Sequence, residues 1–184
     1  MFIQTEDTPN PDTLKFMPGD TVLKTGSVDF SNAESSVSSP LATRLFEIEG
    51  VSRVFLSLDF ISVTKESALE WNTLKPSILT GIMEHYSSGL PVLNTEADIT
   101  EDNSAEDTET IKQIKDLLET RVRPAVAMDG GDISFCSFEA GVVTLQMKGA
   151  CAGCPSSTAT LKMGIENMLR HYIPEVTEVK AAEL

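Results

Sequence analysis

The apolar positions in the first half of the chain switch between short runs and helical spacing, which predicts strands and helices in one small domain. Strands are expected at residues 2–5, 14–17, 51–58 and 60–64. A helix over 41–48 should stop at Gly50. A later helix is predicted from Leu74, Ile78, Ile82 and Tyr86, which recur every four positions, and Ser67 and Glu70 before it have the spacing of a capping box.

A second helical stripe opens the last third of the chain. Its apolar positions are Ile111, Ile114, Leu117, Leu118 and Val122. Thr110 and Gln113 have capping-box spacing at its start, and Arg123-Pro124 should end or kink it.

A hairpin is predicted next, with strands over 133–138 and 142–147 joined at residues 139–141. A loop with two cysteines follows its second strand, then a helix up to Ile173 and a short strand at 176–179. The motif Asp129-Gly-Gly-Asp132 before the hairpin is more typical of a turn than of a metal-carboxylate site. We therefore expect Gly131→Val to harm folding or assembly more than Asn at either aspartate.

The periodic pattern is lost between Pro91 and Thr110, where the sequence becomes acidic. Residues 94–110 contain seven acidic side chains and no Lys or Arg, which is half of the formal net charge of -14. Such a segment is typical of a self-repelling tether. The predicted fold class is therefore α+β, with two small α+β domains at 1–92 and 109–184 joined by an acidic flexible linker at 93–108.

Composition excludes several classes of protein. With 184 residues and a hydrophobic fraction of 41%, the chain has no apolar run near the roughly 20 residues that span a bilayer, so no membrane partner is expected. The negative charge argues against nucleic acid as a partner. Residues 1–7 lack the features of a secretion signal or transit peptide, so the chain should stay where it is made, in the bacterial cytoplasm or, for a mature organellar form, the mitochondrial matrix.

The cysteine loop carries the candidate chemistry. Cys151 and Cys154 form a CxxC pair, Gly153 allows the backbone to wrap closely, and Pro155 suits the first turn of the following helix. Amides at a helix start stabilise thiolates, which favours metal binding and thiol redox chemistry equally. With three cysteines in total, an odd number, a secreted disulfide framework is not expected.

Ligand counting indicates that one chain cannot complete a metal site. A tetrahedral thiolate site needs four donors, and the CxxC pair supplies two. Along the predicted helix His171 would lie roughly 25 Å from Cys154. Cys136, opposite about Thr144 in the hairpin, would lie on the order of 20 Å from Cys151, and His85 belongs to the other domain. A second copy related by a two-fold axis would supply the missing pair.

Several segments resemble the Nfu family of NifU-like iron-sulfur scaffold and carrier proteins. In the second domain these are Asp129-Gly-Gly-Asp132, Gly149-Ala-Cys-Ala-Gly-Cys-Pro-Ser-Ser157 and Tyr172-Ile-Pro-Glu175. In the first domain, Phe2-Ile-Gln-Thr-Glu6, Thr8-Pro-Asn-Pro11, Leu14-Lys-Phe16 and Asp59-Phe-Ile-Ser-Val-Thr-Lys65 resemble the family's N-terminal domain.

The resemblance implies that Cys151 and Cys154 ligate an iron-sulfur cluster, 4Fe-4S rather than the possible 2Fe-2S, bridged by a homodimer. It also implies that upstream assembly proteins supply the cluster, that apo iron-sulfur client proteins receive it, and that the protein is not an enzyme. Without the resemblance, two other hypotheses fit the loop. One is a thiol-disulfide oxidoreductase, and the other is an interaction module bridged by zinc.

Overall fold

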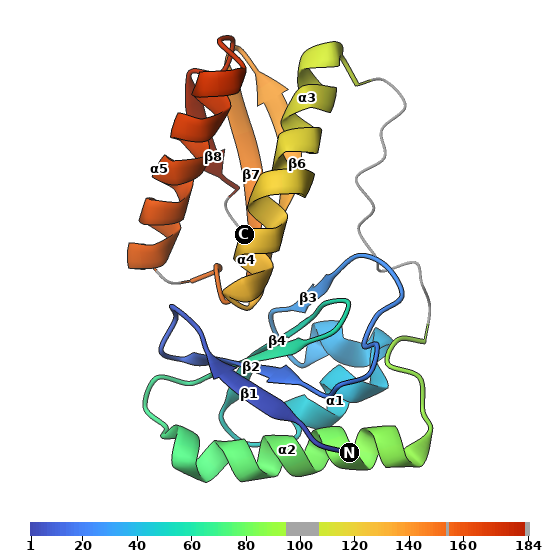
Figure 1. Ribbon diagram of the computed structural model, residues 1–184. Coiled ribbons are helices and arrows are strands. Elements are labelled where there is room, and N and C mark those ends of the chain that lie inside the picture. Colours follow the sequence, from blue (N-terminus) through green and yellow to red (C-terminus); the bar gives the residue numbers. More distant parts are fainter. Residues whose placement is uncertain (95–106, 154, 183–184) are drawn as a thin grey trace. The chain divides into compact units, whose positions relative to one another are not determined.

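The computed structural model describes residues 1–94, 107–153 and 155–182, without the side chains of 155–157. The chain divides into two compact units, Met1–Glu101 and Asp102–Leu184 (Figure 1). Each unit combines helices with a β-sheet, so the predicted class of two small α+β domains is confirmed. The linker expected at 93–108 lies mostly outside the described residues, and its limits and flexibility stay predictions.

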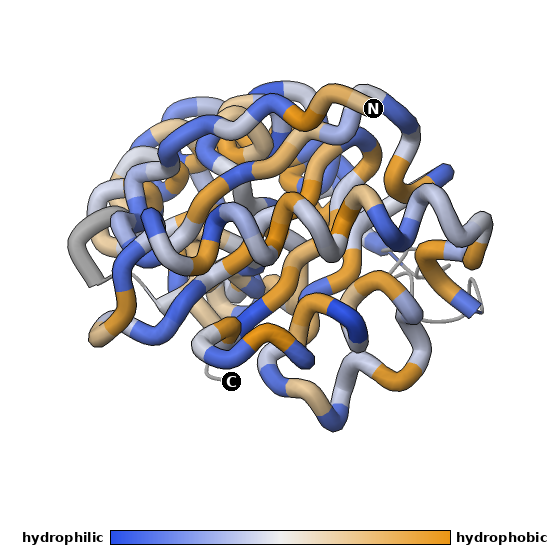
Figure 2. The backbone as a smooth tube through the Cα atoms, turned by 90° about the horizontal axis from the view of Figure 1, so that it is seen from below, coloured by the Kyte–Doolittle hydropathy of each residue, from blue (hydrophilic) through white to orange (hydrophobic). Residues whose placement is uncertain are grey.

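The first unit is an antiparallel sheet of five strands with the order β1-β2-β5-β4-β3. The strands are β1 (Gln4–Asp7), β2 (Thr13–Met17), β3 (Val28–Phe30), β4 (Val51–Leu56) and β5 (Ile61–Lys65). A 3-10 turn, η1 (Glu34–Ser38), precedes α1 (Pro40–Phe46), and α2 (Trp71–Ser88) ends the unit. Both helices bury their apolar stripes in one core with the sheet. Figure 2 shows apolar and polar positions interspersed along the chain. The sequence pattern missed β3 and η1, which are short.

The capping box predicted at Ser67 and Glu70 is wrong. Helix α2 begins at Trp71, and Glu70 makes no side-chain cap. Ser67 instead donates to the Asp12 carboxylate, with 2.7 Å between Oγ and Oδ2, while Lys65 Nζ lies 2.6 Å from Oδ1. These hydrogen bonds, that of Lys65 first, hold the pKa of Asp12 below its ordinary value. A bond to a charged carboxylate is stronger than a neutral cap, which explains the choice.

Burial of His85 on α2 makes the stability of the first unit depend on pH. The side chain is 1% exposed, and burial, aided by the charge of Arg44, lowers the pKa of His85 from its ordinary 6.5. Between the two pKa values the unfolded chain binds the proton more readily than the folded one. The contribution of neutral His85 to the free energy of unfolding is therefore fully present above about pH 6.5. Below that pH it is lost, by at most about 1.4 kcal/mol per pH unit.

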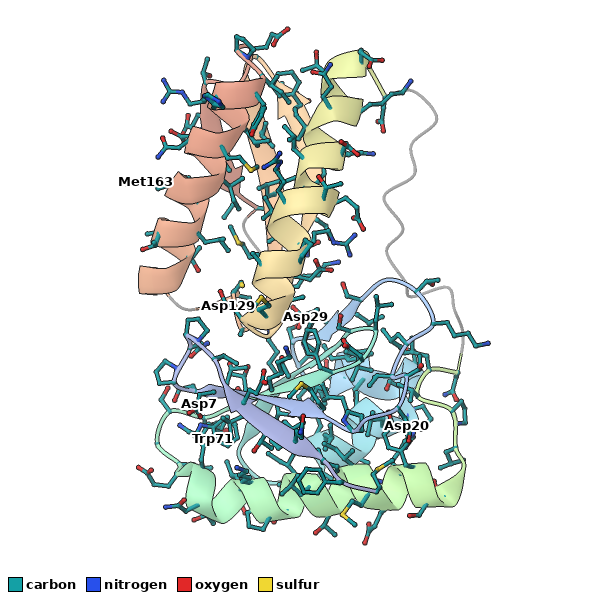
Figure 3. The ribbon with its side chains drawn as sticks, viewed as in Figure 1. Asp7, Asp20, Asp29, Trp71, Asp129 and Met163 are labelled. Atoms are coloured by element: carbon teal, nitrogen blue, oxygen red, sulfur yellow. The ribbon has the colours of Figure 1, made fainter. Side chains whose placement is uncertain are left out.

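The measurement is the urea midpoint at about pH 7.5 and pH 5.5, followed by tryptophan fluorescence. Trp71 is the single tryptophan, so its signal reports on the first unit (Figure 3). His85→Gln should remove most of the difference between the two midpoints, whereas His171→Gln in the second unit should keep it. An unchanged pH difference in His85→Gln would contradict the assignment.

The second unit places two helical segments along a three-stranded sheet (Figure 1). Its elements are α3 (Glu109–Leu117), the π-helical turn η3 (Leu118–Val122), α4 (Arg123–Met128), β6 (Gly131–Glu139), β7 (Val142–Gly149), α5 (Pro155–Tyr172) and β8 (Glu178–Ala181). The sheet order is β6-β7-β8, with β7 antiparallel to β6 and parallel to β8. Fully buried Ile114, Val143, Leu145, Leu169 and Val179 centre the core.

The N-cap predicted for the first helical segment is wrong. Thr108, not Thr110, is the N-cap, and its Oγ1 accepts a hydrogen bond from the amide of Ile111 at 3.4 Å. The helix does not end at Arg123-Pro124 but changes there from the wider π-helical turn η3 to α4, and Pro124 falls in the opening turn of α4. A proline there gives up no necessary N–H bond.

The predicted hairpin is confirmed and is longer than expected. Ala140 (φ 50°) and Gly141 (φ 81°) turn the chain, both in the left-handed region that tight hairpin turns require. The register shifts between Phe135 and Ser137, which makes Cys136 the extra residue of a bulge. The last strand, β8, starts at Glu178, two residues later than predicted.

Candidate functional site

Cys151 lies on a turn that leaves the end of β7. Gly149, the last residue of β7, has a φ of 63°, which reverses the chain. Ala150 donates its amide to the carbonyl of Gly130 (3.2 Å), and Ala152 donates to that of Gly149 (3.0 Å). The cysteine is 7% exposed and packs in the core cluster of the second unit. Backbone bonds on both sides therefore hold the main chain at Cys151 in place, and the thiol is buried.

The thiol of Cys151 lies directly against the backbone of Gly131. A Cβ at position 131 would be 2.6 Å from Cys151 Sγ and 2.7 Å from the carbonyl oxygen of Lys148. No real Cβ makes such contacts, so only glycine fits there. Two chain segments that are far apart in sequence thus meet at the cysteine with no room for a side chain.

The Asp-Gly-Gly-Asp motif forms a turn and the start of a strand. Asp129, labelled at the end of α4 in Figure 3, and Gly130 (φ 78°) make the turn, and Gly131 and Asp132 begin β6. Asp129 is exposed, whereas the carboxylate of Asp132 accepts two hydrogen bonds from the guanidinium of Arg123. This arrangement supports the turn interpretation over a metal-carboxylate site.

The following helix also holds the loop. Thr158, in the first turn of α5, donates its hydroxyl to the carbonyl of Cys151 at 2.9 Å. Thr158 was not among the residues predicted for the site, although a hydroxyl four residues after the CxxC pair can reach back to the loop. Cys154, the second predicted ligand, lies outside the described residues.

The other candidate ligands lie on other elements than the cysteine turn. Cys136 is exposed on the β6 bulge, and His171 lies near the far end of α5 with its ring 5.0 Å from that of Tyr172. His85 is buried in the first unit. Nowhere in the described parts of the chain do three His, Cys, Asp or Glu side chains gather as a metal site. The ligand count made from the sequence stays a prediction, because Cys154 lies outside the described residues.

Charged residues behind the cysteine turn were not foreseen as part of the site. Lys148 is 4% exposed and pairs across the sheet with Asp132, which is 6% exposed and bonded to Arg123. Their only signal in the sequence is charge at positions that a strand buries.

None of the described helices is long and apolar enough to cross a membrane.

Family models match both units of the chain. The model described as "Scaffold protein Nfu/NifU N terminal" matches residues 3–89, and the one described as "NifU-like domain" matches 114–180. The chain belongs to the Nfu family of iron-sulfur cluster scaffold proteins. The resemblance seen in the sequence is thereby confirmed.

The similar proteins include curated relatives from plants and animals. The chain is 53% identical to NifU-like protein 4, mitochondrial, of Arabidopsis thaliana, over 98% of this chain and 65% of that protein. It is also 53% identical to NFU1 iron-sulfur cluster scaffold homolog, mitochondrial, of Homo sapiens, over 98% and 71%. The chain spans about two thirds of the length of the plant relative. A solution structure of a NifU-like protein from Saccharomyces cerevisiae aligns with 52% of this chain. The alignment covers 87% of the yeast protein's chain, with 27% identity and a TM-score of 0.47.

Proposed function

We propose that this protein is a scaffold and carrier in which two copies hold one iron-sulfur cluster between them and transfer it to apo client proteins. Each copy contributes Cys151 and Cys154. The observation that carries the proposal is the fixed Cys151 turn, which has no cluster of further ligands near it in the described residues. The cluster is the cargo of this protein, and no catalytic residue is assigned.

Four thiolates from two CxxC pairs suit both common cluster types, since 2Fe-2S and 4Fe-4S clusters each take four cysteines. The 4Fe-4S form is the one we favour, because the resemblance to the family implies it. Small residues around Cys151, namely Gly149, Ala150, Ala152 and Gly153, let a second copy approach the loop closely.

A site split between two chains suits transfer. Separation of the copies halves the number of ligands, so the cluster becomes available to an acceptor that offers thiolates of its own. Upstream assembly proteins and apo clients are the partners that such a role requires. The word mitochondrial in the names of the relatives supports the matrix as location, and the bacterial cytoplasm finds no such support.

The test is anaerobic reconstitution of the full chain with iron and sulfide, followed by iron and sulfide analysis and mass measurement. A bridged 4Fe-4S cluster predicts about two iron and two sulfide per chain and a dimeric mass. A monomer without cluster would overturn the proposal. One tightly held zinc per dimer after aerobic preparation, with no uptake of iron, would favour the zinc-bridged module instead. Dithiol exchange lost in Cys151→Ser would favour the oxidoreductase.

A further inference from the structure

Arg123 and Asp132 form a two-pronged ion pair close to the cysteine turn. Nε and Nη2 of Arg123 each lie 2.9 Å from a carboxylate oxygen of Asp132, which also accepts the amide of Ile133 at 2.8 Å. The remaining amino group, Nη1, binds Glu119. The bonds to Asp132, above all, raise the pKa of Arg123. The guanidinium therefore stays charged and holds the carboxylate in one orientation.

The ion pair between Arg123 and Asp132 fixes the position of Asp132, the neighbour of the Gly131 backbone that the Cys151 thiol contacts. Asp132 directly follows Gly131, against whose backbone Cys151 Sγ lies. Asp132 is opposite Lys148 and Gly131 is opposite Gly149, while Gly130 accepts the amide of Ala150. Any shift of Asp132 along or out of the sheet would thus move the surface on which the thiol rests.

The helix geometry brings Arg123 to this place. The π-helical turn η3 ends at Val122, and Arg123 is the first residue of α4. Such turns are rare and often occur at functional sites. An ion pair with a buried carboxylate is also poor evidence of a stabilising role, since apolar residues of the same shape often stabilise a protein equally well. A role in geometry accounts for both features.

We propose that Arg123 and Asp132 are positioning residues for Cys151. Their paired hydrogen bonds hold the Gly130–Gly131 backbone in the place where it contacts the thiol of Cys151. The inference builds on the proposed function only where it concerns the lifetime of the bound cluster. Loss of the paired bonds should loosen the thiol before it unfolds the domain, and should shorten the time for which the cluster is held.

The first experiment needs no cluster. In the full chain with Cys136→Ser and Cys154→Ser, Cys151 is the only thiol, and its alkylation rate at fixed pH measures its access to reagent. Arg123→Lys keeps the positive charge but cannot make the two parallel N–H bonds that the guanidinium makes to the Asp132 carboxylate. We expect severalfold faster alkylation, and the same in Asp132→Asn, which keeps one acceptor oxygen.

Two controls separate positioning from general loosening. Arg170→Lys makes the same change at an exposed arginine that pairs with Glu166 on α5, and it should alkylate as the parent does. Val179→Ala removes packing around the one buried side chain of β8 and gives the rate expected of a domain that is merely less stable. A rate in Arg123→Lys no higher than that of the parent, or of Val179→Ala at equal thermal stability, would overturn the inference.

The second experiment follows decay of the reconstituted cluster in the presence of an iron chelator. Groups that orient metal ligands typically change metal affinity at least about tenfold when altered, so Arg123→Lys should lose its cluster about tenfold faster than Arg170→Lys. Equal decay rates would contradict positioning. Failure of the unaltered chain to take up a cluster would overturn the proposed function alone, because the alkylation rates still decide the inference.

Discussion

Replacement of Cys151 by serine is expected to abolish cluster binding and, with it, the dimer that the cluster holds together. Serine has nearly the volume of cysteine but offers no thiolate, and two copies would keep only two of four ligands. Iron should fall from about two per chain to near zero after anaerobic reconstitution. Iron and sulfide analysis with mass measurement gives the result. Cys154→Ser should behave in the same way.

Cys136→Ser is the matched control, since it makes the same change of sulfur to oxygen elsewhere in the same unit. Cys136 is exposed on the bulge of β6, and the ligand count gives it no role, so this variant should bind as much iron as the unaltered chain. A chelator added to the loaded dimer should return it to monomer, because a ligand that binds only the dimer stabilises it by mass action. Full iron content in Cys151→Ser, or loss of iron in Cys136→Ser alone, would contradict the assignment.

Elements set by local sequence were predicted well. The hairpin of β6 and β7 follows from apolar runs around Ala140-Gly141, and α2 and α5 follow from helical spacing. The capping box before α2 was predicted wrongly, because a distant group takes the capping side chain. Ser67 binds Asp12, which lies 55 positions away, and no pattern near Ser67 indicates that.

The bulge at Cys136 explains why the geometry around Cys151 could not be predicted. Continued from Glu139 and Val142 without a bulge, the hairpin register would place Asp132, not Gly131, opposite Gly149. One extra residue shifts the pairing by one and brings glycine to the place where the thiol needs room. The CxxC pair predicts Cys151 and Cys154 as ligands from the sequence alone, whereas the shape of the backbone around Cys151 could not be predicted from it.

Gly131→Ala is the change expected to damage this support most directly. The new methyl would meet Cys151 Sγ at 2.6 Å and the Lys148 carbonyl at 2.7 Å, and the carbonyl belongs to a strand that cannot move aside freely. Overpacking of this kind costs about 1–3 kcal/mol. Gly131→Val should cost more than alanine. Asp129→Asn, at an exposed position, should lower the stability least. Asp132→Asn should lower it more than Asp129→Asn but less than Gly131→Ala, because it weakens the bond to Arg123.

Gly164→Ala on α5 provides the matched control for the added methyl. A Cβ there meets nothing within 4 Å, and alanine in a helix is favoured over glycine by about 1 kcal/mol, so this variant should be slightly more stable. Calorimetry records the unfolding of both units, and Trp71 fluorescence reports on the first unit alone. In both variants the Trp71 transition should be unchanged, so a shift in the remaining calorimetric transition belongs to the second unit. Gly131→Ala should also lower iron uptake under conditions in which the apoprotein remains folded. Unaltered stability and iron content in Gly131→Ala would show that the thiol does not rest on this backbone, and the close approach of β6 to Cys151 would then have no part in holding the cluster.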